Sequence, residues 1–70
     1  MKKTVYIHSY EEVKASFEER LKINQSRSSE EILYPSLVGT IEAIVDMNTT
    51  PSAKVQSIKN CIKAFNDLTR

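Results

Sequence analysis

Apolar side chains recur along most of this chain at the three- and four-residue spacing of amphipathic helices. The broadest apolar pattern runs from Leu33 to Met47. At about 100° per residue its apolar positions cover roughly half of a helix surface, and Gly39, Glu42 and Asp46 mark the polar side. Two short companion helices can hardly cover so wide an arc, so we expect a second copy of the chain or a partner protein to complete the cover. The positions assigned to this oligomer interface are Leu37, Val38, Ile41, Ile44 and Val45.

A narrower apolar stripe predicts a first helix from about Tyr10 to Ile23. Ser9 and Glu12 have the spacing of a capping box, in which each side chain accepts a hydrogen bond from the backbone amide of the other residue. A narrow stripe is typical of an outer helix that covers one side of a core. The members of this stripe are Tyr10, Val13, Phe17 and Leu21.

A second capping box, Ser28 with Glu31, predicts the start of the middle helix, which we expect from about 30 to 47 with a break near Pro35. In a continuous helix the proline ring would clash with the carbonyl of Glu31. The favoured interpretation is therefore a short turn followed by a fresh start at Pro35. A single kinked helix is the alternative.

Thr50 and Pro51 predict the start of a last helix, over about 51–68, because threonine caps helices and proline suits the first helical position. The short connection makes the last two helices antiparallel neighbours. The buried stripe expected for this helix consists of Val55, Ile58, Ile62, Phe65 and Leu68, with Cys61 beside it.

The residues before the first helix form an N-terminal arm, 3–8. Residues 4–8 alternate in the manner of a short strand that would pair with a second copy, and an extended arm packed against the helices is the alternative. The expected fold is therefore mostly α: a short N-terminal strand or extended arm followed by three helices. It forms one small domain over 1–70 and is completed by oligomerisation.

Composition narrows the means by which so small a domain is stabilised. A domain near 70 residues buries only about 60% of its unfolded surface. Cys61 is the only cysteine and His8 the only histidine, so one chain forms neither an internal disulfide nor a tetrahedral Cys/His zinc site. We expect no metal or cofactor, which leaves oligomerisation, most simply as a homodimer, as the common remaining solution.

Charge and hydropathy limit the partners. Ten basic residues against nine acidic ones give no strong field for nucleic acid or an anionic membrane. The Met-Lys-Lys start is not followed by a long apolar run, and no stretch approaches the roughly 20 apolar residues of a membrane span. We therefore expect a cytoplasmic protein that contacts itself and another protein, with nucleic acid as a less favoured partner.

The sequence offers no reaction centre. There is no glycine-rich phosphate loop, and one cysteine with one histidine does not assemble a nucleophile, a base and an orienting group. We therefore interpret the chain as a non-enzymatic regulatory or inhibitory protein that binds another macromolecule, by analogy with bacterial or phage accessory proteins. The proposed contact is the polar face of the last helix, comprising Gln56, Lys59, Asn60 and Lys63. A small-ligand pocket between subunits, lined by Lys59 and Lys63, is a further alternative.

Residues 3–47 also resemble the ribbon-helix-helix DNA-binding proteins. The segment 4–8 looks like the ribbon, and 26–32 resembles the turn between the two helices of that family. The resemblance implies a dimeric repressor whose paired strands enter the major groove, with Thr4, Tyr6 and His8 reading bases. Pro35, the missing turn glycine and the lack of arginine in the strand depart from the family pattern.

Overall fold

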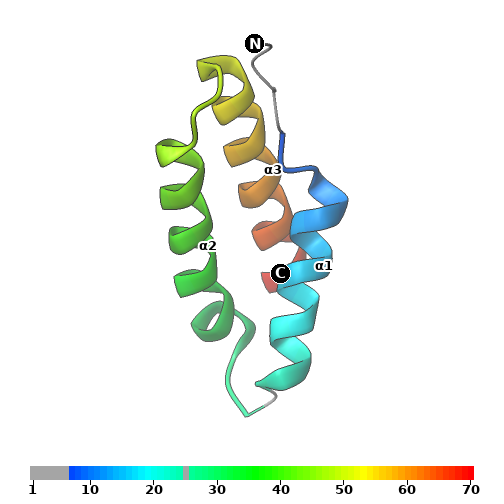
Figure 1. Cartoon of the computed structure of the whole chain (residues 1–70). Helices are drawn as coiled ribbons and strands as arrows, with labels where there is room; N and C mark the ends of the chain where they lie inside the picture. The colour runs from blue at the N-terminus through cyan, green and yellow to red at the C-terminus, as the bar shows by residue number, and fades with distance from the viewer. Residues whose placement is uncertain (1–6, 25) are drawn as a thin grey trace.

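The structure, a computed structural model, describes residues 7–24 and 26–70 and contains three α-helices in these ranges. They are α1 (Tyr10–Ile23), α2 (Ser29–Asp46) and α3 (Pro51–Thr69). Successive helices reverse direction, so α1 and α3 are parallel and α2 is antiparallel to both (Figure 1). This confirms the helical fold class for the described part of the chain. Residues 3–6 of the predicted arm lie outside that part, and residues 7–9 precede α1 without strand structure.

All three helices begin directly after the residues predicted to cap them, and each cap side chain accepts a hydrogen bond from a backbone amide of the first turn. The amide of Glu12 donates to Ser9 Oγ at 3.1 Å, and the amide of Glu31 donates to Ser28 Oγ at 3.2 Å. Each glutamate also accepts from the cap amide, so both capping boxes are complete. Thr50 caps α3 through a single bond, from the amide of Ala53 to Thr50 Oγ1 at 3.2 Å. Because the first amides of a helix have no partner within the helix, these side chains determine where each helix begins.

Pro35 lies inside α2, which is one helix from Ser29 to Asp46. The expectation of a separate start at Pro35 is therefore wrong. Leu33 and Leu37 lie about one turn apart on either side of the proline, and both are buried. Their burial stabilises the helix across the position where the proline removes one backbone hydrogen bond, and a proline in a helix interior costs about 3 kcal/mol.

The core lies where one side of each helix meets the other two. Val13 and Phe17 of α1 are buried, with Tyr10 and Leu21 packed partly against them, which confirms the predicted stripe of α1. The buried members of the cluster are Val13, Phe17, Leu33, Leu37, Ile44, Cys61 and Ala64.

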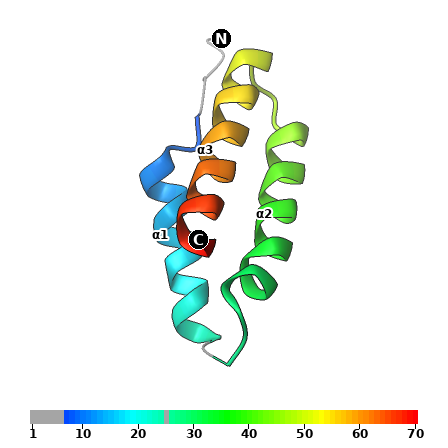
Figure 2. The same cartoon turned by 180° about the vertical axis from the view of Figure 1, so that it is seen from behind.

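The buried side of α3 matches the predicted one in part, because Ile58, Phe65 and Leu68 pack against the core as expected. Val55 and Ile62, expected inside, are exposed, while Ser57 and Cys61 are almost completely buried. The reason is the place of α3, which packs against both other helices, as the view from behind shows (Figure 2). Small side chains along its central line let α1 and α2 approach closely, so larger side chains lie on the flanks or outside. The full set of buried positions in α3 is Ala53, Ser57, Cys61 and Ala64.

Among the helices of the described ranges, none has both the length and the apolar character that a bilayer span requires.

Candidate functional site

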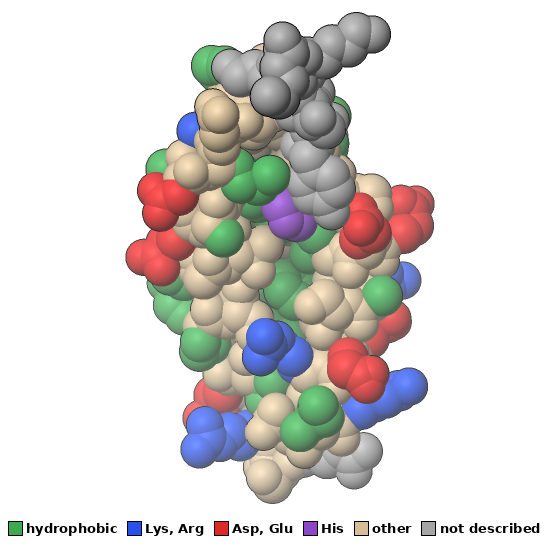
Figure 3. Space-filling model, viewed as in Figure 1, with side chains coloured by type: hydrophobic (Ala, Val, Ile, Leu, Met, Phe, Trp, Pro, Cys, Tyr) green, Lys and Arg blue, Asp and Glu red, His purple; other side chains and the backbone are tan. Residues whose placement is uncertain are grey.

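A hollow in the described surface lies between α1 and α2, and we call it the α1/α2 groove. Its volume is about 540 Å³. Figure 3 looks onto this side of the molecule, where apolar side chains are visible between the two helices. Val13 and Phe17 form its floor, and α1 adds a polar wall. The lining residues are His8, Glu12, Val13, Ser16, Phe17, Arg20, Pro35, Ser36, Gly39, Thr40 and Ala43.

The helical spacing of small side chains creates the groove. On α2, Ser36, Gly39 and Ala43 follow one another at intervals of three and four residues, so they share one side of the helix. A Cβ built on Gly39 would meet no atom within 4 Å. Thr40 donates its hydroxyl to the carbonyl of Ser36 at 2.7 Å, so this polar group is satisfied within the helix. The α2 wall is therefore low, and no large side chain fills the space above it.

The segment before α1 closes one end of the groove. The amide of His8 donates to Ser57 Oγ at 2.9 Å, and Asn60 Nδ2 donates to the carbonyl of His8 at 2.8 Å. These bonds fix the backbone of His8 to α3 and hold its half-buried side chain at the groove rim. Of the residues assigned to DNA in the alternative interpretation, His8 thus has a structural attachment. Thr4 and Tyr6 lie outside the described residues.

Part of the predicted partner face on α3 is occupied within the chain. Besides its bond to His8, Asn60 accepts from Gln56 Nε2 at 3.1 Å. Lys63 lies 3.6 Å from Asp67 and 5.0 Å from the centre of the Tyr10 ring. Of the four residues predicted for the partner face, Lys59 alone forms neither a hydrogen bond nor an ion pair with another described residue. Within this face, Asn60 therefore holds the segment before α1 and Lys63 contacts Tyr10 of α1.

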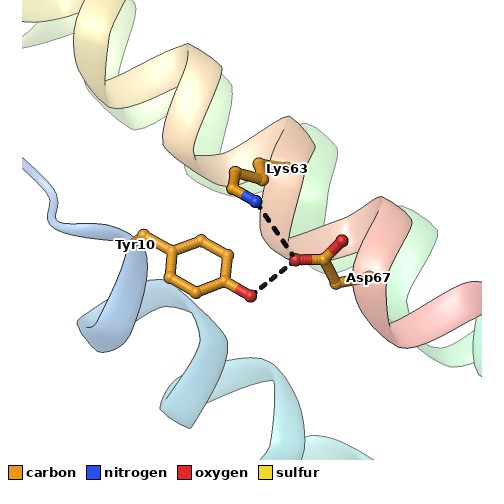
Figure 4. A network of polar contacts seen from close by, with 3 residues as sticks. All are labelled: Tyr10, Lys63 and Asp67. Atoms are coloured by element: carbon orange, nitrogen blue, oxygen red, sulfur yellow. Dashed lines mark hydrogen bonds and ion pairs between the residues drawn. The ribbon is translucent and has the colours of Figure 1, made fainter.

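Figure 4 shows the polar network that joins Tyr10 and Asp67. The Tyr10 hydroxyl donates to Asp67 Oδ2 at 2.6 Å. This hydrogen bond lowers the pKa of Asp67, with Lys63 adding a smaller effect of the same sign, and it raises the pKa of Tyr10. Because both groups are on the surface, solvent weakens the interaction. The network is an attachment between two helices.

A second hollow lies near the end of α3. Its volume is about 370 Å³, and Lys59 and Lys63 line it together with Arg70. These are residues that the ligand-pocket interpretation had singled out. All of the lining residues come from α3 and its cap, so among residues 7–24 and 26–70 no second element encloses the hollow.

The predicted oligomer interface is divided between inside and outside. Leu37 and Ile44 are buried in the core of the bundle, and Ile41 is partly buried. Val38 and Val45 are exposed. One chain therefore covers about half of the apolar arc of α2 by itself.

Cys61 is completely buried, as its place on the apolar side of α3 suggested. Burial raises the pKa of its thiol, because the thiolate would lose its hydration. Within residues 7–24 and 26–70, no group of three or more His, Cys, Asp or Glu side chains gathers as a metal site requires.

Sequence reasoning missed the α1/α2 groove. The available signal was the small-residue spacing of Ser36, Gly39 and Ala43, of which the apolar pattern analysis used only Gly39, as a mark of the polar side of α2. Comparison of the chain with protein-family models, with curated proteins and with solved structures finds no match. The ribbon-helix-helix resemblance therefore stays a prediction, and it includes no counterpart of α3.

Proposed function

We propose that this chain is a non-enzymatic binding protein whose α1/α2 groove receives an amphipathic helix of a partner protein. The observation that carries the proposal is that small side chains line the α2 side of the groove, next to the apolar Val13 and Phe17 of α1. Packed helices lie with their axes about 8–10 Å apart, so close approach needs small side chains on one partner. Gly39 and Ala43 provide them. Helix-in-groove recognition uses such a channel, into which apolar residues insert at helical spacing.

The charge of the groove specifies the partner helix further. Arg20 is exposed and lines the α1 wall, and among the described residues it forms no ion pair with a carboxylate. A guanidinium binds a carboxylate through two parallel hydrogen bonds. The partner helix therefore carries apolar side chains toward Val13 and Phe17 and an Asp or Glu near Arg20.

Such an interaction would make the chain a regulator or inhibitor. A protein of 70 residues that covers one helix of a partner blocks whatever that helix otherwise contacts. No chemistry on the partner is required. This agrees with the absence of a catalytic constellation in the sequence.

A displayed library of amphipathic helices tests the proposal with a defined probe. The library keeps one apolar stripe and varies all other positions, and the full-length chain is the bait. We expect enrichment of helices with an Asp or Glu at one fixed distance from the stripe. Binding of the enriched helices should fall at least about tenfold with Arg20→Glu, as expected for reversal of a close charge pair.

Two substitutions of one residue provide the matched control. Gly39→Leu fills the α1/α2 groove and should abolish binding, whereas Gly39→Ala adds one methyl group in open space and should keep it. Circular dichroism checks that both variants are folded. Equal binding by Gly39→Leu and the parent chain, or a library without enriched helices, would contradict the proposal.

The same variants identify the natural target. Pull-down from a lysate, with and without nuclease, should yield a protein that binds the parent chain and Gly39→Ala and is lost with Gly39→Leu. Capture that disappears with nuclease would instead favour a nucleic-acid function.

A further inference from the structure

A second apolar surface lies on α2 and α3, on the side turned away from α1. Tyr34, Val38 and Val45 of α2 are 62%, 40% and 53% exposed, and Val55 and Ile62 of α3 are 52% and 43% exposed. We call this set, together with the partly buried Ile41, the α2/α3 face. Contiguous apolar surface of this kind marks a contact with another molecule.

Helical geometry places these side chains on one surface. Positions 34, 38, 41 and 45 follow intervals of four and three, so they form one stripe along α2. Residues two apart point about 200° apart, so Val38 and Val45 face away from Ser36 and Ala43 of the α1/α2 groove. On α3, Val55 lies two positions before Ser57 and Ile62 lies two positions after Asn60. Val55 and Ile62 therefore point away from the side of α3 that contacts α1. Lys54 Nζ donates to the carbonyl of Val45 at 2.7 Å, which joins the two stripes at one end.

Charge is distributed unequally over the two helices that form the face. The acidic residues of α2 are Glu30, Glu31, Glu42 and Asp46, and α2 contains no Lys or Arg. The basic residues of α3 are Lys54, Lys59 and Lys63, and its one acidic residue is Asp67. Glu42 lies beside the α2 stripe and Lys59 lies beside the α3 stripe, so the face has an acidic edge on α2 and a basic edge on α3. Lys54 bonds to Val45 between the helices and Lys63 lies over Tyr10 of α1, so neither belongs to that basic edge.

We propose that a second copy of this chain covers the α2/α3 face, related to the first by a twofold axis parallel to the helices. An axis in this direction places α2 of each copy beside α3 of the other, so each acidic edge meets a basic edge. All neighbouring helices of the resulting four-helix core are antiparallel, which is favourable for their dipoles. An axis perpendicular to the helices would place α2 against α2 and bring acidic edges together. The α1/α2 groove stays open in this dimer.

Two exposed charges on the opposite edges test this arrangement. Glu42→Lys and Lys59→Glu each create like-charge contacts across the proposed dimer, so each variant alone should dissociate at least about tenfold more readily than the parent chain. A mixture of the two variants restores opposite charges at both edges and should form a heterodimer. Sedimentation equilibrium measures each dissociation constant, and native mass spectrometry of a mixture with one variant isotope-labelled detects the heterodimer.

The apolar centre of the face has its own test. Val38→Asp introduces a charge where the second copy would bury it, and it should yield a folded monomer by sedimentation and circular dichroism. Glu19→Lys on the exposed side of α1 is the charge control, and Gly39→Leu is the groove control. Both should stay dimeric.

Three outcomes would overturn the proposal. They are a parent chain that stays monomeric up to several hundred micromolar, a Val38→Asp variant that still dimerises, and failure of the Glu42→Lys and Lys59→Glu variants to associate with each other. Recovery of dimerisation when either charge variant is mixed with the parent chain alone would instead indicate the perpendicular axis. Because Gly39→Leu separates the α1/α2 groove from this face, failure here is distinct from failure of the proposed function.

Discussion

Single side chains attach the N-terminal part of the chain to α3. Ser57 is almost completely buried in α3, and its hydroxyl accepts from the amide of His8. Asn60 donates to the carbonyl of the same residue. Because backbone groups near a buried site must be paired, these bonds allow the segment before α1 to lie against α3. Polar residues of α3 thus determine where α1 begins in space, as Ser9 determines where it begins in sequence.

The hydrogen bond from Tyr10 to Asp67 makes the stability depend on acid. The usual pKa of an aspartate is 3.8, and the folded chain lowers that of Asp67, so folding favours its charged form. Its contribution is therefore complete above the usual pKa and is lost as the pH falls through the lowered folded value. We expect the free energy of unfolding of Asp67→Asn to decrease less than that of the parent chain as the pH falls below about 4.

Urea titrations at a series of pH values measure this dependence. Tyr10→Phe removes the donor and should have the same direction of effect. Glu19→Gln removes an exposed carboxylate of α1 and is the control. If the free energy of unfolding falls with decreasing pH in Asp67→Asn and Tyr10→Phe as it does in the parent chain, the hydrogen bond does not form in solution.

At the scale of elements, the sequence predicted the helices better than their buried sides. Helix starts depend on local chemistry, and Ser9, Ser28 and Thr50 each cap a helix as expected. The buried side of α3 depends on where two other helices lie. Periodicity alone favoured the larger Val55 and Ile62, whereas close packing selects small side chains for a helix between two neighbours.

Pro35 shows how tertiary packing prevails over a local breaker. It lies seven residues into α2, is exposed, and has buried leucines on both sides. Replacement with alanine restores a backbone donor and removes the ring clash, so Pro35→Ala should stabilise the chain by up to about 3 kcal/mol. Chemical denaturation measures the change. Gly39→Ala in the same helix is the companion variant, with an expected gain of about 1 kcal/mol. A neutral or destabilising Pro35→Ala would mean that the proline is needed for the shape of α2.

For the molecule as a whole, the α1/α2 groove and the α2/α3 face lie on two sides of one apolar helix, α2. The sequence predicted that two companions cannot cover α2, and its exposed Tyr34, Val38 and Val45 agree with that reasoning. The α1/α2 groove was not predictable in the same way. A groove depends on the absence of side chains between two helices, and a pattern of apolar positions records only where side chains are present.

Phe17 is the most deeply buried side chain of α1. It is 1% exposed and belongs to the cluster that contains Leu33, Leu37 and Cys61 of the other two helices. Replacing a buried phenylalanine with alanine costs about 3–5 kcal/mol, from lost transfer free energy and the cavity that remains. Small domains have about 5–15 kcal/mol in total, so Phe17→Ala should remove a large part of the stability.

The mode of unfolding of that variant tests whether the three helices are one cooperative unit. Without α1, the buried sides of α2 and α3 would lose part of their cover, so we expect amide hydrogen exchange of Phe17→Ala to accelerate in all three helices together. Leu21→Ala, at a partly buried position of the same stripe, is the graded control and should show a smaller loss. Both variants are compared with the parent chain at one protein concentration, because self-association adds to apparent stability. Rapid exchange confined to α1, with α2 and α3 still protected, would show instead that α2 and α3 form a stable unit alone, as a dimer through the α2/α3 face would allow.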